Sequence, residues 1–193
     1  MLEIVVSWKE QRKMKSVYIF MADGFEEIEA LAVVDMLRRA QIKVIMVSVM
    51  EDRIVKGAHE IQVIADAVFE ECEWKDADML VLPGGSIGAK SLGEHEGLRN
   101  ILLEYDKKNR WIAAICAAPG VLGQIGLLKD RHATCYPGLE YKMIGAIPES
   151  KSVVVDGKYI TGRGMGASIE FSLAIIEALE GKGLAEQIKE QIQ

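Results

Sequence analysis

The chain has 193 residues, half of them apolar, which suits a single domain that buries roughly 70% of its extended surface. Its net charge of −6 and the lack of any block of basic residues argue against a general affinity for nucleic acid or acidic membranes, so we expect no specific binding to either. The three cysteines, Cys72, Cys116 and Cys135, are odd in number and show no paired metal-ligand spacing, which argues against a disulfide scaffold or a metal site and favours a reducing, cytoplasmic location.

Residues 1–13 are interpreted as an N-terminal extension, because Met14 looks like a natural start that runs directly into a first apolar strand. They lack the apolar core and cleavage site of a secretory signal, and no stretch of the chain is apolar for long enough to span a bilayer. We expect residues 2–6 to add an edge strand or to pack on a neighbouring subunit; the alternative is an upstream start codon. Residues 14–193 then form one domain.

This domain alternates predicted strands and helices. The pattern predicts strands at 16–21, 43–49, 78–82, 111–115 and 132–137, the last of them short. It predicts a helix that follows the first strand and runs to about residue 40, and further helical stretches at 96–109, 121–128 and 167–179, the last of which Gly181 ends. Hairpins are predicted at 53–64 and 152–161. Such alternation indicates an α/β fold, a doubly wound parallel sheet sandwiched by helices, with short β-hairpins off the main sheet.

Two local features are expected near the ends of these strands. Asp23 should cap the first helix, with Glu26 completing a capping box. Gly84 and Gly85 follow a buried strand, where adjacent glycines permit unusual backbone angles and close approach of a ligand to bare N–H groups, although a plain loop is the simpler interpretation.

Cys116 ends an apolar strand and lies among small residues, immediately before a helical stretch. A sharp strand-to-helix turn would aim its side chain into the crevice at the end of the sheet and leave the next N–H groups free to bind an anion. We expect these amides to lower the pKa of the thiol and to make Cys116 the most easily oxidised cysteine. The alternative is a small buried hydrophobic residue, which most free cysteines are.

Several motifs in this order resemble the ThiJ/PfpI superfamily, and more narrowly the branch of the Parkinson-disease protein deglycase (DJ-one) and its bacterial relatives. They are residues 24–29, 82–85, 113–119, 134–137 and 162–164, and the similarity covers residues 15–189. The resemblance implies a flavodoxin-like fold and a homodimer. It also implies that Cys116 is the reactive cysteine, that Glu29 is the carboxyl group bonded to its sulfur, and that the amides of Gly85 and Ala117 form an oxyanion site.

Glu29 by itself is one more acid in an acidic run, but the first helix should start beside the cysteine strand and so bring Glu29 into the same crevice. Enclosed beside a thiolate, its carboxyl would have a raised pKa and donate its proton as a hydrogen bond. We also expect the apolar residues Ile28, Leu31 and Val34 of this helix to offer surface for the homodimer.

The chain departs from the family pattern at two positions. In the family that this chain resembles, many eukaryotic members have a histidine at the position of Tyr136 and an arginine at the position of His59. Bacterial members often have an aromatic residue at the position of Tyr136. Gly84, Tyr136 and His59 are therefore candidates for the substrate pocket, and a histidine base is not secured. His95 and His132 are interpreted as a surface residue and a strand-end residue.

A cysteine protease or an amidotransferase needs a Cys–His pair, but residue 117 is alanine and no histidine follows His132, so both assignments lack their base. The resemblance instead implies small reactive carbonyls such as methylglyoxal and glyoxal, or carbonyl-modified amines, as substrates of a Cys116 thiolate, in a glyoxalase or deglycase reaction that needs no metal or organic cofactor. The competing hypothesis is a non-enzymatic oxidative-stress sensor or redox-responsive chaperone.

Overall fold

The computed structural model describes residues 14–74 and 77–193, so the strand expected at residues 2–6 lies outside the described residues. Its centre is a seven-stranded sheet in the order β10-β11-β7-β6-β1-β2-β5. These strands are β1 (Ser16–Met21), β2 (Lys43–Ser48), β5 (Ala67–Val68), β6 (Met79–Leu82), β7 (Trp111–Ile115), β10 (Val153–Asp156) and β11 (Tyr159–Gly162). All neighbouring pairs are parallel except β10 and β11, which are antiparallel.

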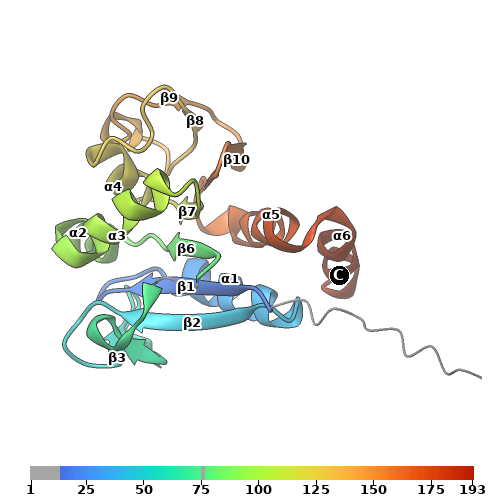
Figure 1. Ribbon diagram of the computed structural model, residues 1–193, viewed down its shortest axis with the longest axis horizontal. Coiled ribbons are helices and arrows are strands. Elements are labelled where there is room, and N and C mark those ends of the chain that lie inside the picture. Colours follow the sequence, from blue (N-terminus) through green and yellow to red (C-terminus); the bar gives the residue numbers. More distant parts are fainter. Residues whose placement is uncertain (1–13, 75–76) are drawn as a thin grey trace, which may run out of the picture.

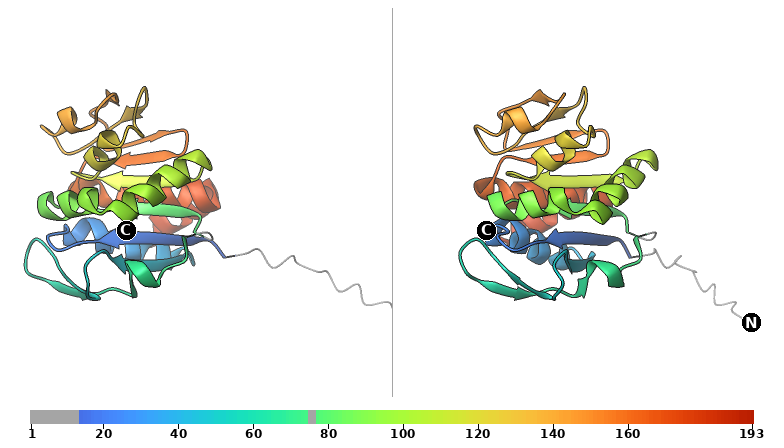
Figure 2. Two further views of the ribbon diagram at one scale, coloured as in Figure 1. Left: turned by 60° about the vertical axis from the view of Figure 1, so that its left-hand side comes forward. Right: turned by 90° about the vertical axis from the view of Figure 1, so that its left-hand side faces the viewer.

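Helices cover both faces of this sheet. They are α1 (Glu27–Arg39), α2 (Ser86–Glu94), α3 (Glu96–Lys107), α4 (Pro119–Gln124), α5 (Ser168–Glu180) and α6 (Lys182–Gln191). One buried cluster joins the sheet to α1, α5 and α6, and a second joins it to α2, α3 and α4. Figures 1 and 2 show the resulting sandwich. The predicted doubly wound, flavodoxin-like α/β fold is confirmed.

Of the two predicted hairpins, one lies apart from the main sheet and the other belongs to it. β3 (Ile54–Lys56) and β4 (Gln62–Ile64) form a separate two-stranded sheet, as expected. The hairpin of β10 and β11 was expected off the main sheet, and this is wrong, because β11 pairs in parallel with β7 and extends the sheet. The whole of β11 is buried, so its side chains need the cover of both helical layers.

Other boundaries differ for local reasons. α2 and α6 were not predicted. The helix expected at 121–128 begins earlier and ends at Gln124, and Gly126 then takes φ +80°. The strand expected at 132–137 shrinks to β8 (His132–Ala133), which pairs with β9 (Ile147–Pro148) in a second small sheet. Short 3₁₀ segments occupy Phe69–Glu71, Glu140–Lys142 and Met165–Ala167.

The start of α1 differs from the expected capping box. Asp23 accepts a hydrogen bond from the backbone N of Lys56 at 2.9 Å, and the backbone N of Gly24 donates to the Lys56 carbonyl at 2.7 Å. The N-cap residue is Glu26, whose side chain makes no capping bond. Asp23 therefore holds the small hairpin against the end of β1 instead of capping the helix.

The expected apolar surface of α1 is only partly present. Val34 is 6% exposed and belongs to the chain's own core, so its assignment to a subunit surface is wrong, whereas Ile28 is 51% exposed. None of the helices in the described part of the chain combines the length and the apolar character that crossing a bilayer requires.

Candidate active site

Cys116 occupies a strained turn directly after β7. Its φ is +66°, a left-handed conformation that costs a non-glycine residue about 1–3 kcal/mol and persists only where neighbours hold it. Here the backbone N of Cys116 donates to the Gly162 carbonyl at 2.9 Å, and its own carbonyl accepts from the N of Tyr136 at 2.8 Å. The adjacent strand β11 and the backbone of Tyr136 thus fix the turn that the sequence predicted.

Two backbone amides face the sulfur of Cys116. The N–H groups of Gly85 and Ala117 both act on the thiol and lower its pKa. Gly85 precedes α2 as its N-cap with φ +89°, and a Cβ at this position would collide with the backbone of residues 24–26. Only glycine fits there, and it turns its N–H toward the thiol.

Glu29 reaches this turn across Gly84. Oε2 of Glu29 accepts a hydrogen bond from the backbone N of Gly84 at 2.9 Å, and the carboxyl group also hydrogen-bonds the Cys116 side chain. Among the described residues, the buried Oε1 has no hydrogen-bond partner. A Cβ at position 84 would lie against this carboxyl and 2.6 Å from the Cβ of Cys116, so Gly84 leaves the space in which the two side chains meet.

The strand before Glu29, β1, was expected to lie next to the cysteine strand, β7, and this is wrong. β6 lies between β1 and β7, so the strand that leads to Glu29 is not adjacent to the strand that leads to Cys116. The carboxyl ends of parallel strands still open on one edge of the sheet, and the glycine turn after β6 lets Glu29 reach across the intervening strand.

The carboxyl and the thiol shift each other's ionisation. Burial raises the pKa of Glu29 to about 7, although hydrogen bonds with Cys116 and Gly84 oppose the rise, so the expected direction is confirmed. Burial and the Glu29 charge raise the pKa of the Cys116 thiol to about 12, while the amides of Gly85 and Ala117 lower it. The prediction that the pKa of Cys116 is lowered is wrong, because burial and the charge of Glu29 outweigh the effect of the two amides. Once either group has ionised, the other is held protonated.

A cavity of about 360 Å³ opens over Cys116. It is lined by Gly24, Glu26, Ala58, His59, Gly85, Ser86, Ile87, Cys116, Ala117, Tyr136 and Leu139. Tyr136 and His59 line this cavity, and Tyr136 remains 53% exposed. The third candidate for the substrate pocket, Gly84, is not among the lining residues and lies against Glu29 and Cys116 instead.

Glu26, Glu27 and His59 form a cluster at the rim that sequence reasoning missed. Nδ1 of His59 lies 2.8 Å from Oε2 of Glu27 and 3.8 Å from Oε2 of Glu26, and the backbone N of His59 donates to Glu27 at 2.7 Å. The potential ligand atoms of these residues lie within 4.8 Å of one another, so they form a set that could hold a metal ion, found among residues 14–74 and 77–193. The acidic run at the start of α1 was the available signal, but it gives no partner for Glu27.

The other two histidines lie elsewhere, as expected. Nδ1 of His95 accepts a hydrogen bond from the backbone N of Leu98 at 3.0 Å and so caps α3. His132, in β8, pairs with Glu149 at 2.7 Å, and both residues line a different cavity. Neither residue lines the cavity over Cys116.

This chain is similar to known proteins in sequence and in fold. Protein DJ-1 homolog B of Arabidopsis thaliana is 36% identical over 178 residues, which are 92% of this chain but only 40% of that longer protein. The glutathione-independent glyoxalase DJ-1 of Schizosaccharomyces pombe is 31% identical over 183 residues, covering 88% of this chain and 93% of that protein. The structure of oxidised Toxoplasma gondii DJ-1 superposes with a TM-score of 0.89 at 34% identity, covering 92% and 97% of the two chains. Because the family model described as DJ-1/PfpI also matches residues 15–178, this chain belongs to the DJ-1/PfpI family.

Proposed function

We propose that the protein converts small α-oxoaldehydes such as methylglyoxal and glyoxal into hydroxycarboxylates through the Cys116 thiolate. The observation that carries the proposal is the placement of the Cys116 sulfur between two amides and one carboxyl group of raised pKa. The amides favour negative charge at this point, and the carboxyl is able to hold or release a proton near neutral pH.

The reaction needs only these groups and water. The sulfur adds to the aldehyde carbon, and the new alkoxide takes a proton, which gives a hemithioacetal. Glu29 then removes the proton from this carbon and returns a proton at the neighbouring carbon, so that the aldehyde is oxidised to a thioester while the ketone is reduced to an alcohol. Water cleaves the thioester to lactate, or to glycolate from glyoxal, and regenerates the thiol.

The name of the fission-yeast relative, a glutathione-independent glyoxalase, supports this assignment. The surroundings of the sulfur also favour it over a protease or an amidotransferase. The histidine that lines the cavity is His59, and its ring is engaged with Glu27, so it is not placed as the base that those reactions need. Repair of carbonyl-modified amines would start with the same thiolate addition.

A second candidate function is an oxidative-stress sensor or redox-responsive chaperone, in which oxidation of Cys116 is the signal. The observation that favours it is the relative solved in an oxidised state. We further propose a cytoplasmic homodimer, with the exposed Ile28 at or near its interface. Light scattering that gives a monomeric mass at micromolar concentration would overturn the dimer.

The test of the proposed function is turnover of methylglyoxal to lactate by the purified protein. We expect Cys116→Ala to abolish turnover and Cys72→Ala, the matched cysteine outside the cavity lining, to retain it. Equal rates for the wild type and Cys116→Ala would remove the enzyme hypothesis and leave the sensor.

A further inference from the structure

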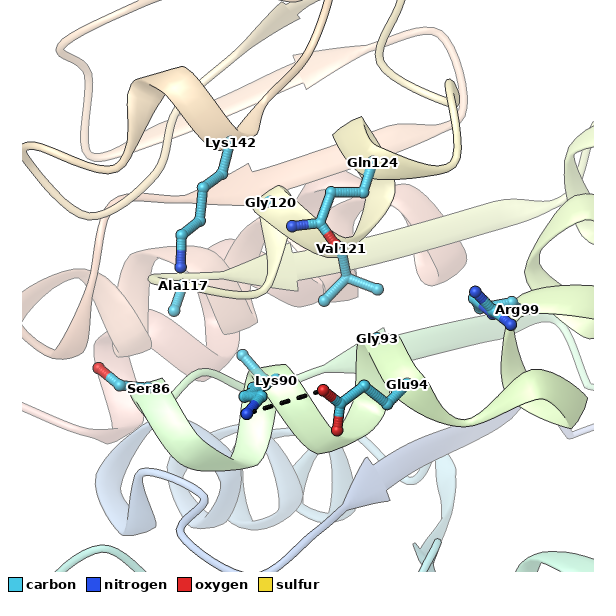
Figure 3. A pocket seen from close by; sticks show the side chains of 11 residues that line it. Ser86, Lys90, Gly93, Glu94, Arg99, Ala117, Gly120, Val121, Gln124 and Lys142 are labelled. Atoms are coloured by element: carbon cyan, nitrogen blue, oxygen red, sulfur yellow. Dashed lines mark ion pairs between the residues drawn. The ribbon is translucent and has the colours of Figure 1, made fainter.

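A second cavity of about 510 Å³ lies between α2 and α4, next to the cavity over Cys116 (Figure 3). It is lined by Ser86, Ala89, Lys90, Gly93, Glu94, Arg99, Ala117, Gly120, Val121, Gln124 and Lys142. Ser86 and Ala117 line both cavities. A molecule held at Cys116 therefore has a second chamber within reach, and His59 does not line that chamber.

The charge of this second cavity is opposite to that of the molecule. The chain as a whole carries −6, but the lining has three cations, Lys90, Arg99 and Lys142, and a single carboxylate, Glu94. Lys90 and Glu94 approach to 3.8 Å with both side chains largely exposed, which is a weak pair. None of the ion pairs found in residues 14–74 and 77–193 uses Arg99 or Lys142.

The position of Lys142 is set by packing. It ends the 3₁₀ segment Glu140–Lys142, which the buried side chain of Met143 anchors. A Cβ at Gly120 would lie 2.9 Å from the Cβ of Lys142, so the glycine in α4 is what allows the lysine to pack so closely. In Figure 3 the Lys142 side chain extends into the cavity toward the turn that holds Ala117, while Lys90 extends from α2 on the opposite wall.

The two cavities differ in what they attract. Glu26 lines the Cys116 cavity, and its carboxylate disfavours an anionic group there. The cations of the neighbouring cavity favour one, since guanidinium and ammonium groups bind carboxylate and phosphate oxygens through charge-assisted hydrogen bonds. A three-carbon dicarbonyl such as methylglyoxal has nothing to place in this second chamber.

We propose that the cavity between α2 and α4 is an anion subsite, and that the substrates include α-oxoaldehydes that carry a carboxylate or a phosphate on their far end. This inference rests on the proposed function and names its substrate class. The aldehyde lies at Cys116, the chain passes Ser86 and Ala117, and the anion lies with Lys142 and Lys90. The cations take no part in bond making: the aldehyde carbon is oxidised, the adjacent ketone is reduced and one water is consumed, as for methylglyoxal.

The test compares dioxovalerate, an α-oxoaldehyde with a terminal carboxylate, with its neutral methyl ester. We expect the wild type to prefer the carboxylate in kcat/KM, and Lys142→Gln to reduce this preference about tenfold, the loss expected when one charge-assisted hydrogen bond is removed. Added salt should reduce the wild-type preference for the carboxylate over the ester in kcat/KM, because it screens the charges of the cavity. Lys43→Gln, at the amino end of β2 and so at the opposite edge of the sheet, is the matched control and should leave the preference intact. Hydroxypyruvaldehyde phosphate beside dioxovalerate distinguishes a phosphate subsite from a carboxylate subsite.

A second measurement separates the subsite from the reaction. Calorimetric titration with the products should show that hydroxyglutarate binds more tightly than lactate, and that Lys142→Gln removes the difference. Methylglyoxal turnover without any preference for dioxovalerate over its ester would overturn the subsite and leave the proposed function standing. Conversely, Lys142-dependent binding of hydroxyglutarate without turnover of any aldehyde would support the subsite and overturn the glyoxalase reaction.

Discussion

Glu27 and Glu29 lie two residues apart on α1, are 4% and 1% exposed, and yet have opposite pKa shifts. Burial alone would raise the pKa of Glu27, but hydrogen bonds from the side chain and backbone of His59 outweigh it and lower the pKa overall. Around Glu29 burial prevails, and the pKa rises to about 7. The partners around each carboxyl, and not the residue type or its position in the helix, thus decide which of them holds a proton at neutral pH.

The two environments correspond to two tasks. Glu27 stays ionised and anchors the loop of the small hairpin through His59, while the backbone N of Ala58 donates to the Phe25 carbonyl at 2.8 Å. Glu29 faces the only cysteine that lines the cavity and is poised to move a proton. Three substitutions of these two residues test this division, and a fourth, at Tyr136, tests the cavity that Cys116 faces.

The largest effect is expected from Glu29→Gln on turnover. Glutamine keeps the shape and the bond from Gly84 but cannot transfer a proton, so kcat for methylglyoxal should fall by about 10²–10⁴-fold. Glu27→Gln, the matched change on the same helix, should lower kcat far less. Similar losses in both variants would mean that the contrast between the two carboxyl groups has no catalytic meaning.

The pH dependence of stability should separate the same two residues. In the unfolded chain Glu29 ionises near its ordinary pKa of 4.5, whereas the native state keeps the proton up to about 7, so the native state binds more protons in this window and loses stability as pH rises through it. The loss is at most about 3 kcal/mol. Urea denaturation at pH 5 and pH 8 should show this decrease in the wild type and a flatter profile in Glu29→Gln.

Glu27 supplies the opposite sign for comparison. Its pKa is lowered in the native state, so its contribution is present above the unfolded pKa of 4.5 and is lost as pH falls below it. Glu27→Gln should therefore flatten the acid limb. Because it also removes the partner that raises the pKa of His59, it should change the profile between pH 5 and pH 8 as well, but less than Glu29→Gln does, since His59 is exposed. A neutral-range profile that Glu29→Gln does not alter would contradict the raised pKa of Glu29.

Oxidation should depend on Glu29 as well. All three cysteines have raised pKa values, so selectivity rests on the surroundings of each sulfur. Cys116 faces a cavity and two amides, Cys135 is buried, and the sulfur of Cys72 donates to the Val68 carbonyl at 3.5 Å. Mild peroxide should add two oxygens to Cys116, because a sulfinate is able to accept the Glu29 proton and face the amides. In Glu29→Leu, peptide mass spectrometry should find more sulfenic acid and disulfide. Oxidation of Cys72 or Cys135 before Cys116 would contradict the prediction that the surroundings of Cys116 make it the most easily oxidised cysteine.

The smallest effect is expected from Tyr136→Phe. The tyrosine lines the Cys116 cavity, and loss of one hydroxyl hydrogen bond to a substrate oxygen should lower kcat/KM by no more than about tenfold. Alkylation of Cys116 by iodoacetamide should proceed as in the wild type. A changed alkylation rate would show that the ring shapes the thiol's surroundings and does not merely contact the substrate.

The fold was largely predictable because buried strands and amphipathic helices alternate along the chain. α2 was missed because Gly88 and Gly93 weaken its helical pattern after the glycine turn, and α6 because Gly181 ends α5 and the next helix starts at once. The order of strands could not be predicted, since it depends on which face each connecting helix covers. That is why β6 was not placed between β1 and β7.

The residues of the candidate site could be predicted from the sequence, but the pKa shift of Cys116 could not. The turn at Cys116 followed from the apolar run that ends there, while Glu29, Gly85 and Ala117 came from family resemblance. The net pKa shift of Cys116 could not be predicted, because it depends on a contact with Glu29 across an intervening strand. The role of Glu27 was hidden for the same reason, since His59 meets it only after the hairpin folds back.

The bridge across Gly84 also concerns how the protein is made. Glu29 and Gly84 are 55 residues apart in the chain, and the turn at Cys116 is held by the carbonyl of Gly162, which is synthesised later still. A growing chain therefore carries Cys116 as an ordinary exposed thiol until most of the sheet has assembled, because the carboxyl, the amides and the strained turn arrive together. The particular surroundings of this thiol belong to the completed fold alone, so its chemistry begins only when folding has ended.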